Sequence, residues 1–159
     1  MKKLLFTIAL LLASTMSFAQ TGDDVINEFK EMKNVEFVNA SKSMISMMIS
    51  KVNNPMISDL AKNIESVNVL SMDECSDKMK KDVSERVNNL KGKGYEEMLR
   101  AKDNDQNVLI LTKMNGEDIK ELLLLTVEDN ENCLIQIKGN IKKEDIDKMI
   151  EKIIKDEYN

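Results

Sequence analysis

Residues 108–127 read VLILTKMNGEDIKELLLLTV, two apolar segments on either side of a turn signal. Val108–Met114 is rich in the aliphatic and β-branched residues that pack well in strands. Asn115-Gly116 follows, and both central residues of a type I′ hairpin turn need a positive φ. Ile119–Val127 is apolar on both faces, which is typical of a central strand. This stretch therefore predicts a β-hairpin in the middle of an antiparallel sheet.

Weaker strand signals lie on both sides of this hairpin. Tyr95–Ala101 precedes it and Cys133–Lys138 follows it, while Val67 and Val69 alternate with polar residues after Glu65. We therefore expect an antiparallel sheet of about four to five strands. A ferredoxin-like arrangement from residue 65 onward is one strand order that fits this pattern.

Helical periodicity fills most of the remaining chain. Apolar residues of 75–90 fall on one narrow stripe, and residues after Gly139 carry the most regular stripe, which consists of Ile146, Met149, Ile150, Ile153 and Ile154. Shorter helices are expected at 23–33, 41–52 and 56–64, the last two separated by Pro55 and the residues before it. The expected fold is α+β, with helices mainly on one face of the sheet, and it is preceded by short helices in the N-terminal part of the chain.

The first 19 residues have the layout of a secretory signal peptide. Lys2 and Lys3 precede the apolar run Leu4–Ala13, and small residues lead to a cleavage point after Ala19. A membrane anchor is the alternative, but the run is shorter than the roughly 20 residues that cross a bilayer. No cysteine near the cleavage point offers a site for a lipid. We therefore expect a single mature domain, residues 20–159, that is periplasmic or secreted and has no stable membrane anchor.

Composition excludes several classes of function. The chain carries a net charge of −5 and has no histidine and no tryptophan in 159 residues. Nucleic-acid binding needs a basic surface, and the common nucleophile triads and many zinc sites need histidine. We expect no nucleic-acid partner, no cofactor and no recognisable catalytic residues. Carboxylate chemistry, thiol chemistry or binding without chemistry remain.

Three methionines in the predicted helix 41–52 allow two interpretations. Met44, Met47 and Met48 stand at i, i+3 and i+4, so their thioethers could bind Cu(I). Methionine also fills irregular gaps in a core. Ile45 and Ile49 beside them favour the core, and we expect these methionines to be buried.

Asp103, Asp105 and Glu131 are candidate ligands for a hard cation such as Ca²⁺ at one end of the sheet. A calcium loop needs more oxygen ligands at fixed spacing. Solvated turn residues are therefore the favoured interpretation, and no metal site is predicted.

Cys75 and Cys133 are the two cysteines of the chain. Cys75 follows the predicted strand that begins at Glu65, and Cys133 begins the last predicted strand. If these strands are antiparallel neighbours, the two Cα atoms could lie at disulfide distance. The alternative is two buried free thiols, since Cys75 lies on an apolar helical stripe and Cys133 shares a strand face with Ile135 and Ile137. Both alternatives stay open.

Several segments together resemble a family of exported Bacteroidetes proteins catalogued as domain of unknown function 4252. In chain order they are EFVNASKSM at 36–44, YEEML at 95–99, GEDIKEL at 116–122, and KGNI at 138–141 followed by Glu144-Asp145-Ile146. The resemblance implies export but no assigned activity, so it transfers no functional residues. Some relatives carry a lipid-attachment cysteine where this chain has Gln20.

These observations favour a non-enzymatic binding or interaction module of the cell envelope, whose partner is an unknown envelope protein or a small ligand. The alternatives are an envelope hydrolase that uses carboxylates and a methionine-based copper-handling protein. Carboxylates that converge in a deep pocket would favour the hydrolase. A shallow, exposed apolar patch would favour the interaction module.

Overall fold

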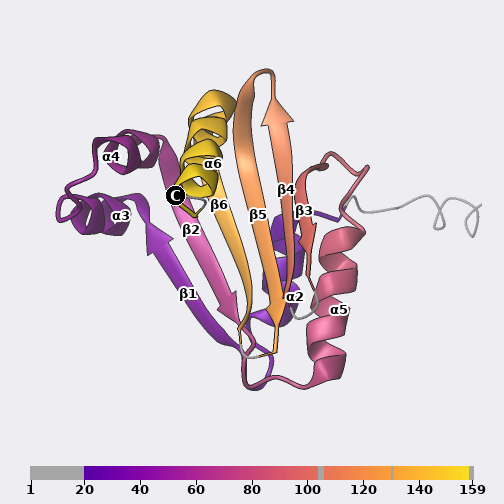
Figure 1. The fold of residues 1–159 in the computed structure, drawn as a ribbon. Helices are drawn as coiled ribbons and strands as arrows, with labels where there is room; N and C mark the ends of the chain where they lie inside the picture. Colours follow the sequence, from indigo (N-terminus) through magenta and orange to yellow (C-terminus); the bar gives the residue numbers. More distant parts are fainter. Residues whose placement is uncertain (1–19, 104–105, 130, 158–159) are drawn as a thin grey trace, which may run out of the picture.

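A single antiparallel sheet organises the chain (Figure 1). The computed structural model describes residues 20–103, 106–129 and 131–157, and within these ranges the sheet has six strands in the order β1-β2-β6-β5-β4-β3. The strands are β1 (Glu36–Ser41), β2 (Ile64–Ser71), β3 (Glu96–Lys102), β4 (Gln106–Asn115), β5 (Asp118–Glu128) and β6 (Asn132–Lys142). The antiparallel α+β class is confirmed, but the expected count of four to five strands is too low. The additional strand is β1, which pairs with β2 along its whole length.

Helices pack against both faces of this sheet. They are α2 (Gly22–Phe29), α3 (Lys42–Ile49), α4 (Pro55–Lys62), α5 (Asp77–Asn88) and α6 (Lys143–Glu157). One core joins α2 and α5 to Leu70, Leu111 and Leu123, and the other joins α3, α4 and α6 to Ile119, Leu122 and Ile141. We call these sides the α2–α5 face and the α3–α4–α6 face. The expectation of helices mainly on one face is therefore not confirmed, because β5 is apolar on both faces and both need cover.

The strand order is not ferredoxin-like. Strands β3, β4, β5 and β6 follow one another in sequence as an antiparallel meander, whereas a ferredoxin-like order places a helical crossover among these strands. The pairing of the first and last strands of this region, which was the condition for a disulfide, is present, since β2 pairs antiparallel with β6.

Gly116 and Gly139 occupy other positions in the structure than the sequence predicted. Asn115 pairs with Asp118, so the hairpin loop is Gly116-Glu117, and Gly116 supplies the positive φ of 65°. Gly139 does not lead into the final helix, because it lies within β6 and the helix begins at Lys143. A Cβ at Gly139 would lie 2.1 Å from the carbonyl oxygen of Asn63. This close approach of two backbone segments requires glycine.

The signal-peptide prediction and part of the final helical stripe, Ile153 and Ile154, lie outside what the structure describes at side-chain level. Among the described helices, none has the length and apolar character needed to cross a bilayer.

Candidate functional site

The helices α3 and α4 expose a group of apolar side chains. Met47 and Met48 are 62% and 60% exposed, and Met44 is 45% exposed. Val52, which follows α3, and Ile57, in the first turn of α4, are exposed as well. We call these five residues the methionine surface. The expectation that the three methionines are buried is therefore wrong.

The orientation of α3 explains why its methionines are exposed. The helix begins directly after β1, and Ile45 is the residue that it buries against the sheet. At 100° per residue, Met47 lies about 160° around the helix from Ile45, and Met44 and Met48 lie about 100° and 60° from it, both on the same side. The polar residues Lys42, Ser43 and Ser46 fall on one side of α3, and the isoleucines and methionines together cover more than half of its circumference. The sequence therefore does not decide which part of this broad apolar arc is buried.

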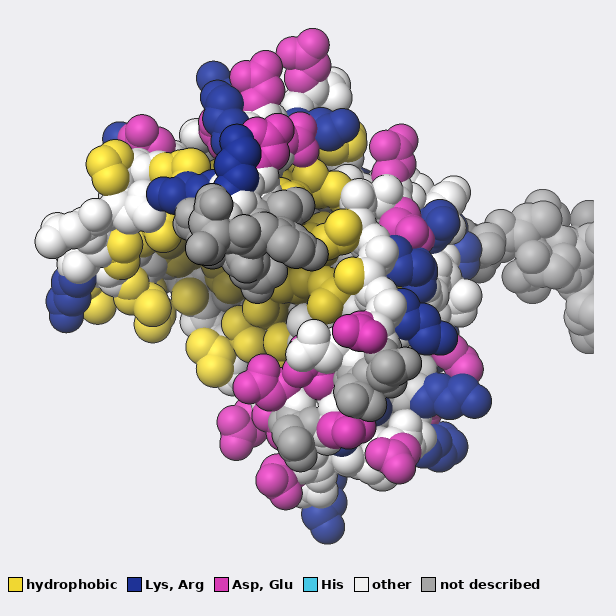
Figure 2. Space-filling model, in the orientation of Figure 1, with side chains coloured by type: hydrophobic (Ala, Val, Ile, Leu, Met, Phe, Trp, Pro, Cys, Tyr) yellow, Lys and Arg dark blue, Asp and Glu magenta, His cyan; other side chains and the backbone are white. Residues whose placement is uncertain are grey.

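Apolar side chains gather on the α3–α4–α6 face, including the corner formed by α3 and α4 (Figure 2). Each of these two helices has one buried residue, Ile45 in α3 and Ala61 in α4. Contiguous exposed apolar surface on a folded domain commonly marks an interaction site. The arrangement is therefore suited to binding.

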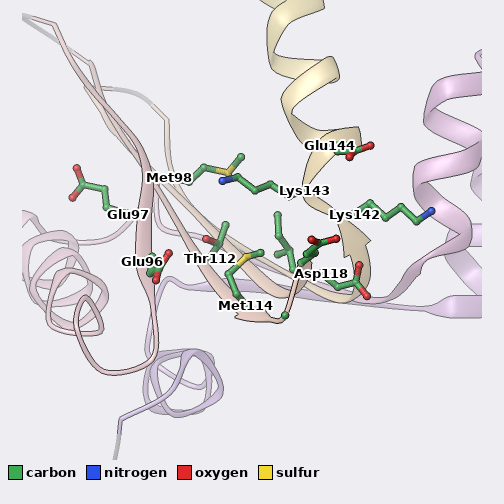
Figure 3. A pocket seen from close by; sticks show the side chains of 12 residues that line it. Glu96, Glu97, Met98, Thr112, Met114, Asp118, Lys142, Lys143 and Glu144 are labelled. Atoms are coloured by element: carbon green, nitrogen blue, oxygen red, sulfur yellow. The ribbon is translucent and has the colours of Figure 1, made fainter.

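A cleft of about 680 Å³ lies between the meander and the start of α6. Its lining includes Met98, Met114 and Ile119 together with the carboxylates of Glu96, Glu97, Glu117, Asp118 and Glu144. Figure 3 shows Glu97 and Glu144 pointing away from the cleft in opposite directions, while Lys143 extends toward Met98. Glu97 and Glu144 therefore do not converge, and among the described residues no group of three Cys, Asp or Glu side chains could hold a metal ion.

Glu97, on the rim of this cleft, is held by two cations. Arg100 and Lys91 donate to its Oε2 at 2.9 and 3.0 Å. These hydrogen bonds and charges lower the pKa of Glu97 to about 2. A general acid at neutral pH needs the opposite shift, so Glu97 acts as an ion-pair partner and not as a proton donor.

A network of buried polar side chains fastens α2 to the sheet on the α2–α5 face. The Tyr95 hydroxyl accepts from the Gly22 N–H at 2.8 Å and donates to Glu121 at 2.9 Å. Gln136 donates to the second oxygen of Glu121 at 2.8 Å and to Asp23 at 2.9 Å. Tyr95, Glu121 and Gln136 are 2%, 7% and 0% exposed. Every oxygen of the Glu121 carboxylate therefore has a partner, as a buried charge requires.

The ionisation of this network follows from its contacts. Burial is the largest cause that raises the pKa of Tyr95, and the Glu121 carboxylate raises it further. For Asp23, burial opposes ionisation, but hydrogen bonds from Lys138 and Gln136 outweigh it and lower the pKa. Tyr95 thus stays protonated and Asp23 stays ionised at neutral pH, which is the pattern of a structural network.

Close packing surrounds the start of α2. A Cβ at Gly22 would lie 2.0 Å from Oε1 of Glu121. Thr21 caps the helix in a capping box with Asp24. Sequence periodicity did not identify this network.

The two cysteines are free thiols in the structure. Cys75 is buried in the α2–α5 core, and its thiol donates to the carbonyl oxygen of Asn34 at 3.2 Å. Cys133 lies 3.2 Å from the Thr126 hydroxyl and alternates with Leu134, so it belongs to the opposite face. The structure does not bring the two together, although Cys133 does pair with Ser71 of β2, so the strand pairing that a disulfide requires is present.

The three candidate cation ligands are not assembled into a site by the described residues. Asp105 lies outside the described ranges. Asp103 and Glu131 contribute backbone hydrogen bonds to two different turns, with Gln106 and Glu128 respectively.

Comparison with known protein families finds a match. The model of the family described as domain of unknown function (DUF4252) matches residues 29–149. The chain belongs to this family. The matched range of the DUF4252 chain begins at the last residue of α2 and ends within α6, so it includes the whole sheet. No curated protein and no solved structure matches the chain.

Proposed function

We propose that this DUF4252 domain is a non-enzymatic binding module of the cell envelope and that the methionine surface is its binding site. One observation supports the proposal most: Met47 and Met48 expose about three-fifths of their surface on α3, a helix whose single buried residue is Ile45. Methionine is unbranched and polarisable, and binding surfaces that adapt to a partner are rich in it.

The carboxylate cleft supports this choice over a hydrolase. An acid–base pair needs two carboxylates with separated pKa values that face the same substrate atoms. In the cleft, one oxygen of Glu97 accepts from both Arg100 and Lys91, and Asp118 accepts from Asn140 at 3.0 Å.

Export of the chain is part of the same proposal. The layout of Lys2, Lys3, Leu4–Ala13 and Ala19 predicts a mature form that begins at Gln20. Mass spectrometry of the protein from envelope fractions should then find Gln20 at the N-terminus. Recovery of intact Met1 from those fractions would contradict export.

A photo-cross-linking side chain at position 47, introduced in the native host, tests the binding site. Lys78, whose side chain is 86% exposed on α5, is the matched control position. We expect adducts at position 47 and none at position 78. Exchanging Met44 and Met48 for Gln should remove the adducts, whereas exchanging them for Leu should keep them. Equal adduct formation at positions 47 and 78 would overturn the proposal.

A thioether copper site is the second candidate, because Met44, Met47 and Met48 are exposed at i, i+3 and i+4 of one helix. The Leu and Gln variants separate the two functions. Replacing all three methionines by Leu removes the sulfur atoms but keeps the apolar surface. If copper is the ligand, competition with a chromogenic Cu(I) chelator should show loss of copper binding both in this Leu variant and in a variant with Gln at the same three positions.

A further inference from the structure

Lysines border the methionine surface. Lys42 begins α3, Lys51 lies between α3 and α4, and Lys62 ends α4. Residues 42–62 contain three lysines and a single acidic residue, Asp59, in a chain whose net charge is −5. The segment that forms this corner is therefore basic, in contrast to the acidic remainder of the chain.

Two of these lysines have no acidic partner. Lys62 pairs with Asp59 at 2.7 Å, and both side chains are about three-quarters exposed. Lys42 and Lys51 are exposed and form no ion pair with the residues that the structure describes. Their positive charges are thus available to an external anionic group.

The methionine surface projects from the domain, and this shape favours a lipid partner over a protein partner. Side chains that are three-fifths exposed, such as Met47 and Met48, project from the domain and do not line a hollow. A protein partner would need a complementary cavity to receive them. The boundary between headgroups and acyl chains receives projecting apolar side chains without any preformed cavity.

The position of α3 and α4 is suited to a planar partner. Helices α3 and α4 form one corner of the molecule, beside β1 at the edge of the sheet (Figure 1). Each helix buries a single residue against the domain. Because short helices draw most of their stability from packing, a surface that covers their outer side would stabilise them.

We propose that the methionine surface docks reversibly on an anionic phospholipid bilayer. The methionines, Val52 and Ile57 enter the interface, and Lys42 and Lys51 lie at the level of the lipid phosphates. The acidic remainder of the chain is repelled by the same surface, which orients the domain with the α3–α4 corner toward the lipid. This inference rests on the proposed function, because it names the partner of the same surface.

Vesicle sedimentation tests the inference. The chain from Gln20 onward, which contains every described element, is mixed with phosphatidylcholine vesicles that contain or lack phosphatidylglycerol. We expect binding only to the vesicles with phosphatidylglycerol, and release as salt is added. Lys42→Gln with Lys51→Gln should weaken the binding about 25-fold, about fivefold for each charge removed.

Matched variants control for charge and folding. Lys78→Gln with Lys93→Gln removes two exposed lysines from outside the α3–α4 corner and should leave vesicle binding unchanged. Met47→Gln with Met48→Gln should abolish it. Since all of these side chains are exposed, thermal unfolding monitored by circular dichroism should be unaltered in each variant.

The outcomes separate this inference from the proposed function. No wild-type binding to vesicles with phosphatidylglycerol, equal binding to both vesicles, or equal weakening by both lysine pairs would overturn the lipid inference. If the cross-linker at position 47 then captures a protein or a second copy of the chain, with the Leu and Gln variants behaving as stated, the proposed function stands. If it captures nothing beyond the control, both fail.

Discussion

Replacing Tyr95 by Phe is the sharpest test of the buried network. The ring is 2% exposed and packs in the α2–α5 core, and Phe keeps that packing. The lost hydroxyl leaves the Gly22 N–H and one oxygen of Glu121 without a partner in the interior. A buried polar group left unpaired costs about 1–3 kcal/mol. We therefore expect the free energy of unfolding to fall by about 2–4 kcal/mol.

Urea unfolding followed by circular dichroism measures this loss, and an unchanged slope against urea keeps the comparison valid. Asp59→Asn is the control, because it removes an ion pair that is about three-quarters exposed on both sides; such pairs contribute less than about 1 kcal/mol. A loss below about 0.5 kcal/mol for the Tyr95→Phe protein would refute the argument that the network fastens α2.

The stability difference between wild type and Tyr95→Phe should depend on pH in the alkaline range. Burial and the Glu121 carboxylate raise the pKa of Tyr95 above its ordinary value of 10.0. The folded state therefore holds the phenol proton more tightly than the unfolded state does. Its contribution to stability is complete below pH 10 and decreases as pH rises above that value. The difference in unfolding free energy between wild type and Tyr95→Phe should shrink above pH 10, and a constant difference up to pH 11 would contradict this account.

Other expectations concern packing and thiols. Met47→Ala should change the unfolding free energy by less than about 0.5 kcal/mol, whereas Met72→Ala, fully buried, should cost about 2–5 kcal/mol; similar losses would mean that the methionine surface is core. Thiol titration of the unreduced, denatured protein should count two thiols, and fewer than two would indicate a disulfide. In the folded protein Cys133 should react before Cys75, because burial raises the pKa of the Cys75 thiol. Gly139→Ala should cost about 1–3 kcal/mol in urea unfolding through overpacking against Asn63, and an unchanged midpoint would show that the backbone there can yield.

The central hairpin could be predicted because local signals agreed. In 108–127 an apolar strand, a turn with glycine and a second apolar strand point to the same structure, and β4 and β5 are found within two residues of their expected bounds. The turn slipped by one position, since a glycine serves equally in either of two registers. Only the pairing of Asn115 with Asp118 decides between them.

The faces of elements were harder to predict than the elements themselves. In α3, the isoleucines and methionines form an apolar arc that is wider than the sheet can cover, so tertiary packing selects Ile45 as the buried residue. For the cysteines, the strand pairing that a disulfide requires is present, but alternation along β6 turns Cys133 away from the core that contains Cys75. A disulfide depends on the face as well as on the neighbour.

The buried network did leave a signal in the sequence. Glu121 shares a strand face with Leu123 and Leu125, and Gln136 shares one with Leu134. A charged and an amide side chain on apolar faces of adjacent central strands indicate a shared hydrogen-bond system. Their partners, Tyr95 and the start of α2, are distant in sequence and could not be inferred from spacing.

The pairing of β2 with β6 has a consequence for how the chain folds. The meander from β3 to β6 joins strands that follow one another, so it can form from local contacts. Strand β2 cannot complete its pairing until β6, the last strand of the described residues, is available, because Ser71 must meet Cys133. Until then one edge of β2 exposes unpaired backbone groups next to Val67 and Val69. Contacts between such distant segments slow folding, so the nascent N-terminal half of the chain is the part that a chaperone would need to protect.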